Sequence, residues 1–351
     1  MSNPIGKPGK PVGELVGKLR LGFYPYTYAR VSVMKGDLIK PIEWHRLLKM
    51  GVSEILVYMQ NHGYKTEVDT ISAQGNNGSD IALLEMALNK NLMRTLTKLR
   101  RISDEKLQHV LRIYLERYDM ENFKTILRGK CANISQEEVE ALLLPSVNYP
   151  DQYFENLIKK EKISDVVKSM PFKITDTQEL FKLENDLDHV YYEHLLTLTS
   201  QLSGQGAALQ QFVKAEMDIL NIKMLLRLKK SGIEKKEVKK YLIHPSSFVL
   251  KLSERESLLD ITRDLKRSNY IPKFVEEGDE SELLKNIEIN LDTALLKKEV
   301  KLMHQFPLTA NVMLGFMFAK EIEVKNLKVL LKGKQLQLDE PYLEKLMVVA
   351  S

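Results

Sequence analysis

One ten-residue phrase occurs three times in this chain at nearly regular spacing, at residues 121–130, 220–229 and 325–334. Its second residue is always Asn: Asn122, Asn221 and Asn326. These Asn residues lie 99 and 105 positions apart along the chain. Repetition at a fixed period constrains a fold strongly, because each copy forms the same local unit and stacks on its neighbours.

More of each unit repeats than this phrase. An acid stands three positions before each Asn, at Asp119, Asp218 and Glu323. A further Glu lies 37, 37 and 38 positions upstream of the three Asn residues, at Glu85, Glu184 and Glu288. A third shared piece follows each phrase, at residues 134–144, 233–242 and 338–347. We therefore expect each unit to contain three helices in order, A, B and C.

The three pieces have the apolar spacing of amphipathic helices. In helix B of the first unit, Leu111, Leu115 and Ile126 fall on one side of a 3.6-residue helix. Ser135, followed by Glu138, predicts a capped start for helix C. Gly129 and Gly232 are expected to end helix B in the left-handed conformation, and Pro25 to interrupt an opening helix. No comparable series of alternating strands is visible, so the predicted fold class is all-α.

Composition limits the classes of function. The 52 Lys and Arg exceed the 47 Asp and Glu only slightly and both signs are interspersed, which argues against a dedicated nucleic-acid binder. A single cysteine, Cys131, excludes an internal disulfide and suits a reducing compartment. No stretch reaches the roughly 20 apolar residues of a membrane-spanning helix, and residues 1–22 do not resemble a secretory signal. We expect a soluble, cytoplasmic protein.

Two patterns resemble sites of chemistry. The stretch from Gly13 to Lys18 resembles a phosphate-binding loop but has three residues between its glycines and Leu after the Lys, so a flexible extension is favoured. Asp186, His189 and Glu193 are spaced to share a helix face, but a di-iron bundle needs a second Glu-x-x-His helix, and the sequence contains none. We predict no catalytic residue, no cofactor and no metal.

The acid and Asn of each helix B are three positions apart, so we expect them to face one another. Their repetition permits two interpretations: an equivalent partner contact in each unit, or a structural polar pair where helix A packs on helix B. The second is favoured because buried polar atoms need partners. Arg128, Arg227 and Lys332 also recur near the end of helix B, where a cation suits the helix dipole, and they are candidates for partner binding.

These residues resemble the C subunit of the archaeal and bacterial A/V-type ATPases, whose eukaryotic counterpart is the d subunit of the V-ATPase. The resemblance rests on the Tyr-rich opening from Tyr24 through Arg30, on the helices 119–130 and 218–229, and on the stretch 320–328. It covers residues 23 to 351. It adds Arg30 to the candidate partner-binding residues.

The resemblance implies a funnel-shaped, pseudo-threefold, all-helical protein without catalysis of its own. Such a protein is a central-stalk subunit, present once per complex and monomeric when isolated. It lies on the cytoplasmic face of the membrane rotor ring, receives the central shaft, and couples ATP hydrolysis or synthesis to ion transport. The alternatives are a helical-repeat scaffold unrelated to rotary ATPases and, less favoured, a helical metalloenzyme.

The repeats and the resemblance together divide the chain into five parts. We expect a flexible extension at 1–22, a partial helical unit at 23–79, and repeats at 80–175, 176–277 and 278–351. The third repeat lacks the short amphipathic segment that follows helix C in the other two. Residues 38–48 resemble helix C and residues 52–59 resemble that short segment. We therefore predict that residues 24–65 pack against residues 281–332 and close the array, because an open terminal face leaves apolar surface in water.

Overall fold

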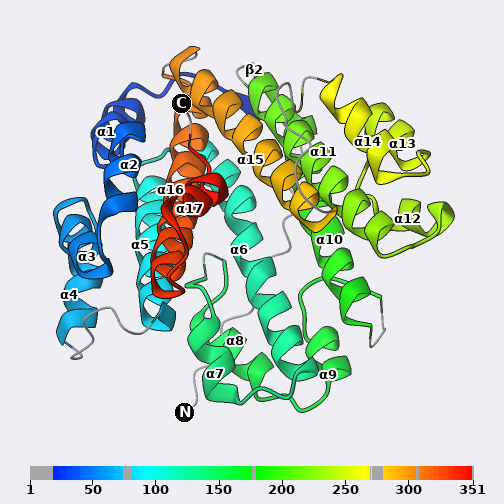
Figure 1. Ribbon diagram of the computed structural model, residues 1–351, viewed down its shortest axis with the longest axis horizontal. Helices are drawn as coiled ribbons and strands as arrows, with labels where there is room; N and C mark the ends of the chain where they lie inside the picture. Colours follow the sequence, from blue (N-terminus) through cyan, green and yellow to red (C-terminus); the bar gives the residue numbers. More distant parts are fainter. Residues whose placement is uncertain are drawn as a thin grey trace. The chain divides into compact units, whose positions relative to one another are not determined.

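The computed structural model describes residues 19–73, 81–146, 148–175, 179–204, 206–268, 270, 280–305 and 308–349. These residues form helices almost throughout, which confirms the all-α class (Figure 1). The described strands are two three-residue segments, β1 (Leu19–Leu21) and β2 (Leu202–Gly204), which pair in parallel with Leu19 opposite Leu202. The Gly13 to Lys18 stretch lies outside the described residues.

Contacts divide the chain into two compact units, Met1–Leu21 with Asn89–Gly206, and Gly22–Leu88 with Ala207–Ser351. The helix α5 (Ile81–Arg101) runs across the border between them. The border also divides the predicted second repeat after its helix A. Compact units and sequence repeats therefore do not coincide.

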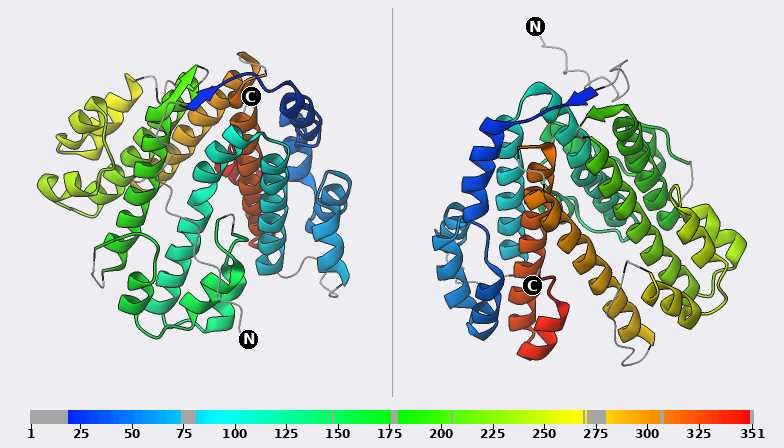
Figure 2. Two further views of the ribbon diagram at one scale, coloured as in Figure 1. Left: turned by 180° about the vertical axis from the view of Figure 1, so that it is seen from behind. Right: turned by 90° about the horizontal axis from the view of Figure 1, so that it is seen from above.

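The first unit is organised around α6, the helix B of the first repeat. The helix α10, which is helix A of the second repeat, packs along α6, and three short helices also contact α6 (Figure 2). The bounds of these helices are α6 Glu105–Cys131, α7 Gln136–Leu142, α8 Asp151–Ile158, α9 Ile163–Lys168 and α10 Leu180–Gln201.

The second unit has three long helices, with α15 packed along both α11 and α16. Three short helices pack against one another and against α11, and appear as a yellow-green group in Figure 1. The bounds are α11 Ala207–Lys230, α12 Lys235–Tyr241, α13 Ser247–Ser253, α14 Leu258–Lys266, α15 Glu280–Gln305, α16 Ala310–Gln335 and α17 Glu340–Leu346.

The N-terminal helices belong to this second unit, and their contact with α16 agrees with the helix B part of the prediction for residues 24–65. The helices α1 and α3 lie against α16, and α2 lies against α17. The Tyr24 N–H donates to the Leu308 carbonyl at 2.6 Å. These helices are α1 Pro25–Gly36, α2 Pro41–Lys49, α3 Val52–Asn61 and α4 Lys65–Ala73.

The assignment of residues 38–48 to helix C needs correction, because α17 already occupies that place in the third repeat. Instead α2 corresponds to α8. The Lys334 ammonium donates to the Leu48 carbonyl of α2, just as Lys130 donates to the Ile158 carbonyl of α8. The sequence pattern does not distinguish the two positions, because helix C and the helix that follows it are both short and amphipathic.

Local sequence explains several helix ends. Ser135 caps α7 in a reciprocal pair with Glu138, as predicted. Pro25 does not interrupt α1 but begins it, at a position where the missing N–H costs no hydrogen bond. Gly232 has φ 73° after α11, as predicted, whereas Gly129 lies inside α6. A Cβ on Gly129 would lie 2.3 Å from Val139 Cγ2, so close packing of α7 requires this glycine.

Candidate functional site

The three repeat Asn side chains each bind the backbone of a residue 22 positions further along, just after helix C. The Asn amide donates to that residue's carbonyl, and its oxygen accepts from the same residue's N–H, at 2.7–2.8 Å. The pairs are Asn122 with Leu144, Asn221 with Ile243, and Asn326 with Val348. All three Asn residues are buried. Each Asn therefore holds the end of helix C against helix B.

The acid three residues earlier binds a different segment in each repeat. Asp119 accepts from Ser146 at 2.5 Å and from Asn148 at 2.8 Å. Asp218 accepts from the Tyr270 hydroxyl at 2.6 Å. In both cases the carboxylate holds a segment that follows helix C. A carboxylate suits this position because it can accept several strong hydrogen bonds.

In the third repeat this acid binds the N-terminal segment. Glu323 accepts from the Ile39 N–H and the Tyr64 hydroxyl, both at 2.6 Å. Lys320 donates to Glu323 at 2.7 Å and to the Tyr64 hydroxyl at 2.9 Å, and all three side chains are buried. Burial, followed by the Glu323 charge and hydrogen bond, raises the pKa of Tyr64, so the phenol stays protonated as a donor.

The prediction that the acid and the Asn form a polar pair where helix A packs on helix B is therefore wrong. The two side chains bind different segments after helix C, and neither set of bonds lies at the packing of helix A on helix B. Spacing alone identifies a helix face but cannot show which loop covers it.

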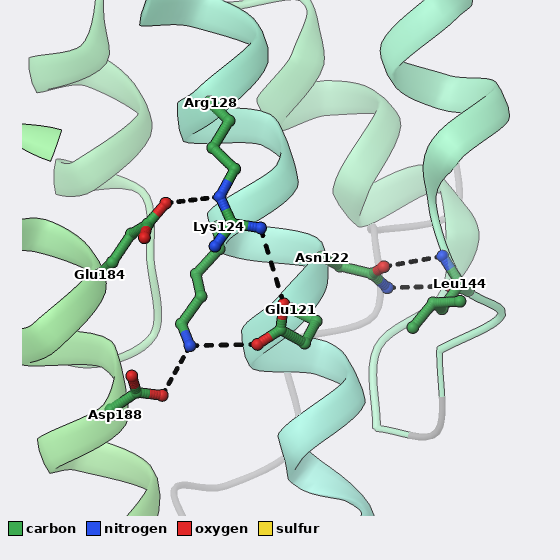
Figure 3. A network of polar contacts seen from close by, with 7 residues as sticks. All are labelled: Glu121, Asn122, Lys124, Arg128, Leu144, Glu184 and Asp188. Atoms are coloured by element: carbon green, nitrogen blue, oxygen red, sulfur yellow. Dashed lines mark hydrogen bonds and ion pairs between the residues drawn. The ribbon is translucent and has the colours of Figure 1, made fainter. Parts of the chain in front are cut away.

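The contact between helix B and the next helix A is made by a second set of repeat positions. In the first unit Lys124 donates to Asp188 at 2.6 Å and to Glu121 at 3.1 Å (Figure 3). One turn further along α6, Arg128 donates to Glu184 at 2.6 Å. Lys124 is 8% exposed, so its charge depends on these carboxylates.

The corresponding positions meet between α11 and α15 in the second unit. Lys223 donates to Asp292 at 2.5 Å, and Arg227 donates to both oxygens of Glu288 at 2.7 and 2.8 Å. Lys325 of α16 also donates to Asp292, at 2.6 Å. The two aspartates consequently have different electrostatic surroundings.

Burial raises the pKa of Asp188, and Lys124 does not offset that rise. Burial acts in the same direction on Asp292, but Lys223 and Lys325 together outweigh it and hold the pKa of Asp292 below its ordinary value. Glu184, Glu288 and both aspartates occupy repeat positions, yet sequence reasoning gave them no role. Their common distance from the repeat Asn was the signal that could have identified them.

The four candidate partner-binding residues differ in what they already bind. Arg128 and Arg227 form the ion pairs with Glu184 and Glu288. Arg30 on α1 and Lys332 on α16 are exposed and form no ion pair within the described parts of the chain. The structure therefore separates two cations that join helices from two that face solvent.

Asp186, His189 and Glu193, whose spacing predicts one shared helix face, lie on α10. Asp186 accepts from the Thr175 N–H at 2.9 Å, and Glu193 is exposed. Among the described residues, no three His, Cys, Asp or Glu side chains gather as metal ligands would. The described helices also include none with the length and apolar character needed to span a membrane.

Comparison with known proteins assigns the family. The model of the ATP synthase (C/AC39) subunit family matches residues 27–346. The C subunits of several A-type ATP synthases are similar over most of the chain. That of Methanococcoides burtonii is 32% identical, covering 93% of this chain and 94% of its own. That of Methanosarcina acetivorans is 31% identical, covering 97% and 98%, and that of Archaeoglobus fulgidus is 31% identical, covering 93% and 96%.

The match spans the repeats and the N-terminal helices that bind Glu323. The chain therefore belongs to the ATP synthase (C/AC39) subunit family.

Proposed function

We propose that this chain is a non-catalytic central-stalk subunit of a rotary A/V-type ATPase. It connects the rotating shaft to the membrane rotor ring at the cytoplasmic face, with one copy in each complex. The observation that carries the proposal is the similarity of nearly the whole chain to the C subunits of A-type ATP synthases. An unrelated helical-repeat scaffold is disfavoured by the same similarity.

The bonded repeats suit a part that transmits torque. The residue after each helix C is held to helix B by two hydrogen bonds to an Asn side chain. The helix pairs α6–α10 and α11–α15 each carry ion pairs in addition. Hydrogen bonds are directional, so they fix the orientation of the segments that they join. The repeats at 80–175, 176–277 and 278–351, with 23–79 closing the array, remain part of this proposal.

Arg30 and Lys332 are the proposed partner contacts. On α1, Arg30 lies one turn from two exposed apolar side chains, Tyr26 at 66% and Val33 at 73%. A cation among exposed apolar side chains is typical of a protein interface, where Arg and aromatic residues are enriched. Arg128 and Arg227 act instead as positioning residues within the chain.

The test compares membranes containing the complete complex with membranes in which this chain is deleted. Without the chain, ATP hydrolysis by the catalytic head should continue while ATP-driven ion transport is lost. Normal transport by complexes shown by native mass spectrometry to lack the chain would refute the role. Arg30→Ala and Lys332→Ala should weaken retention of the chain in the complex, whereas Lys345→Ala, another exposed cation, should not.

The absence of catalysis has its own test. The purified chain should show no ATP turnover. Turnover that disappears on Lys18→Ala would contradict the proposal and identify the Gly13 to Lys18 stretch as a nucleotide site.

A further inference from the structure

The helices that follow α11 carry a concentration of positive charge. Residues 229–267 contain eleven Lys or Arg and six Asp or Glu, an excess equal to the net charge of +5 on the whole chain. The corresponding residues 130–168 of the first repeat contain five Lys or Arg and seven Asp or Glu. Both segments begin at the end of helix B and continue into the short helices after it. Because the segment of the first repeat has no basic excess, these helices do not require one to form.

The contrast is sharpest in helix C. In α12, Lys235, Lys236, Lys239 and Lys240 surround a single Glu237, whereas α7 carries three Glu and no Lys. Each helix buries one Val in the same place, Val238 or Val139. Packing is thus shared, while the charge of the solvent-exposed side is reversed.

Ion pairs join α12 and α14 to the connection between α13 and α14. Lys235 pairs with Glu256 at 3.3 Å, Lys239 pairs with Glu254, and Arg255 pairs with Asp264 at 2.6 Å. These pairs neutralise part of the charge of α12 and of the connection between α13 and α14.

Three other cations of the segment are exposed to solvent. Lys236 and Lys251 are exposed and form no ion pair within the described residues, and Lys240 contacts only Glu237 on its own helix. Two large apolar side chains of the same segment are exposed as well, Leu250 at 42% and Leu259 at 59%. Burial and the nearby Lys235 charge lower the pKa of Lys229, as expected where like charges gather.

We propose that residues 229–267, the basic segment, bind the headgroup surface of anionic phospholipids. A polybasic segment is attracted to an anionic leaflet, and exposed Leu side chains can enter the acyl boundary. The composition favours lipid over an acidic protein: the segment has eight Lys and three Arg. Protein interfaces are enriched in Arg and depleted in Lys, and two of the three Arg already pair with Asp264 and Asp260.

This inference does not rest on the proposed rotor role. It concerns binding of the isolated chain to a lipid surface, and its failure would leave the family assignment and the coupling role untouched.

The experiment is flotation of the purified full-length chain with vesicles of 30% phosphatidylglycerol and 70% phosphatidylcholine, compared with pure phosphatidylcholine vesicles. The test variant is K236Q/K240Q/K251Q, which keeps Lys235 and Lys239 and hence their ion pairs with Glu256 and Glu254. The matched control is K159Q/K160Q/K162Q, which removes the same three charges from the corresponding segment of the first repeat. Far-ultraviolet circular dichroism and thermal unfolding verify that both variants are folded.

The wild type should float with the anionic vesicles in 0.1 M NaCl, and binding should fall in 0.5 M NaCl as the charges are screened. At roughly fivefold in partitioning per cation, the triple variant should lose on the order of 100-fold, and the control should retain wild-type binding. The proposal is overturned if the wild type does not float with anionic vesicles, if it binds both vesicle types equally, or if the control loses as much as the test variant. Retention of the wild type on immobilised polyglutamate without vesicle binding would instead assign the segment to an acidic protein partner.

Discussion

The helix pairs α6–α10 and α11–α15 bring the same repeat positions together but surround them with opposite surplus charge. Between α6 and α10, one base, Lys124, contacts two carboxylates, those of Asp188 and Glu121. Between α11 and α15, one carboxylate, that of Asp292, contacts two bases, Lys223 and Lys325.

Both additional charges come from the first position of the repeated phrase, which is Glu121 in the first copy and Lys325 in the third. The difference shows that the repeat preserves which helices are joined, while one variable position sets the local electrostatics.

The same two regions also differ near neutral pH. In the first unit, His194 of α10 lies 3.0 Å from the buried Glu116 of α6. The residues at the corresponding positions of α11 and α15 are Ala215 and Lys298. Only the first of these two helix pairs therefore has an imidazole at this place.

The largest expected effect tests what the repeats share. Replacing Asn122, Asn221 or Asn326 with Leu removes two hydrogen bonds and leaves a backbone N–H and C=O unpaired. Each substitution should lower the free energy of unfolding by about 3 kcal/mol, measured by chemical denaturation. Asn→Asp at the same sites keeps the acceptor but sets a second carboxylate oxygen against the backbone carbonyl, so it should also destabilise the protein. A loss confined to one of the three sites would show that the repeats are not held equivalently.

The next prediction exchanges a residue between the two regions. Leu228 stands in the second repeat where the first has Gly129. Gly129→Leu places a side chain into Val139 and should cost about 2 kcal/mol, because overpacking outweighs the gain in helix propensity. Adding Val139→Ala should recover part of the loss. Equal stability of the single variant and the wild type would mean that α7 can shift away from α6.

The charge comparison is tested by Asp188→Asn and Asp292→Asn. Asp292→Asn leaves two ammonium groups facing each other and should cost about 1.5 kcal/mol, after allowance for the half-exposed Lys325. Asp188→Asn leaves Lys124 paired with Glu121 and should cost less than Asp292→Asn.

The pH dependence of these two variants follows from the same contrast. Because the pKa of Asp292 is lowered in the folded state, its contribution is present above the ordinary value of 3.8 and is lost as pH falls through the folded value. The difference between wild type and Asp292→Asn should therefore shrink below about pH 4. Equal costs for both substitutions at pH 7 would contradict the comparison.

The smallest effect concerns His194. Its hydrogen bond to Glu116 raises the pKa of His194 in the folded state despite burial. The resulting stabilisation is complete below the ordinary value of 6.5 and is lost as pH rises through the folded value. His194→Gln should remove less than about 1 kcal/mol at pH 6 and have less effect at pH 9. Lys298→Gln is the matched control and should show no such dependence between these pH values.

Much of the helical content could be predicted because helix formation depends on nearby residues. The apolar spacing around Leu111 and Leu115 and the cap at Ser135 are visible within one or two turns. Gly129 was misjudged because its role depends on Val139, ten positions away and on another helix. Glycine is favoured both at the C-terminal end of a helix and where two helices pack closely. The sequence alone therefore does not distinguish these two roles.

The polar positions were found, but their partners were not. Asp119 and Asn122 share a helix face, as the spacing indicates, yet they bind different loop segments. Helical spacing specifies direction around one axis and carries no information on the segment that covers that direction.

By itself the sequence determined that the chain is helical, and that an acid, an Asn and a Lys or Arg recur at fixed positions in three of its helices. Local propensity and periodicity suffice for this, because both act over a few residues. Only the tertiary structure decided that α10 packs along the helix B of the preceding repeat, and that Glu323 binds the N-terminal residues Ile39 and Tyr64. Those pairings join residues as many as 284 positions apart. They are selected by the burial of complete faces and the satisfaction of buried charge, which no local pattern encodes.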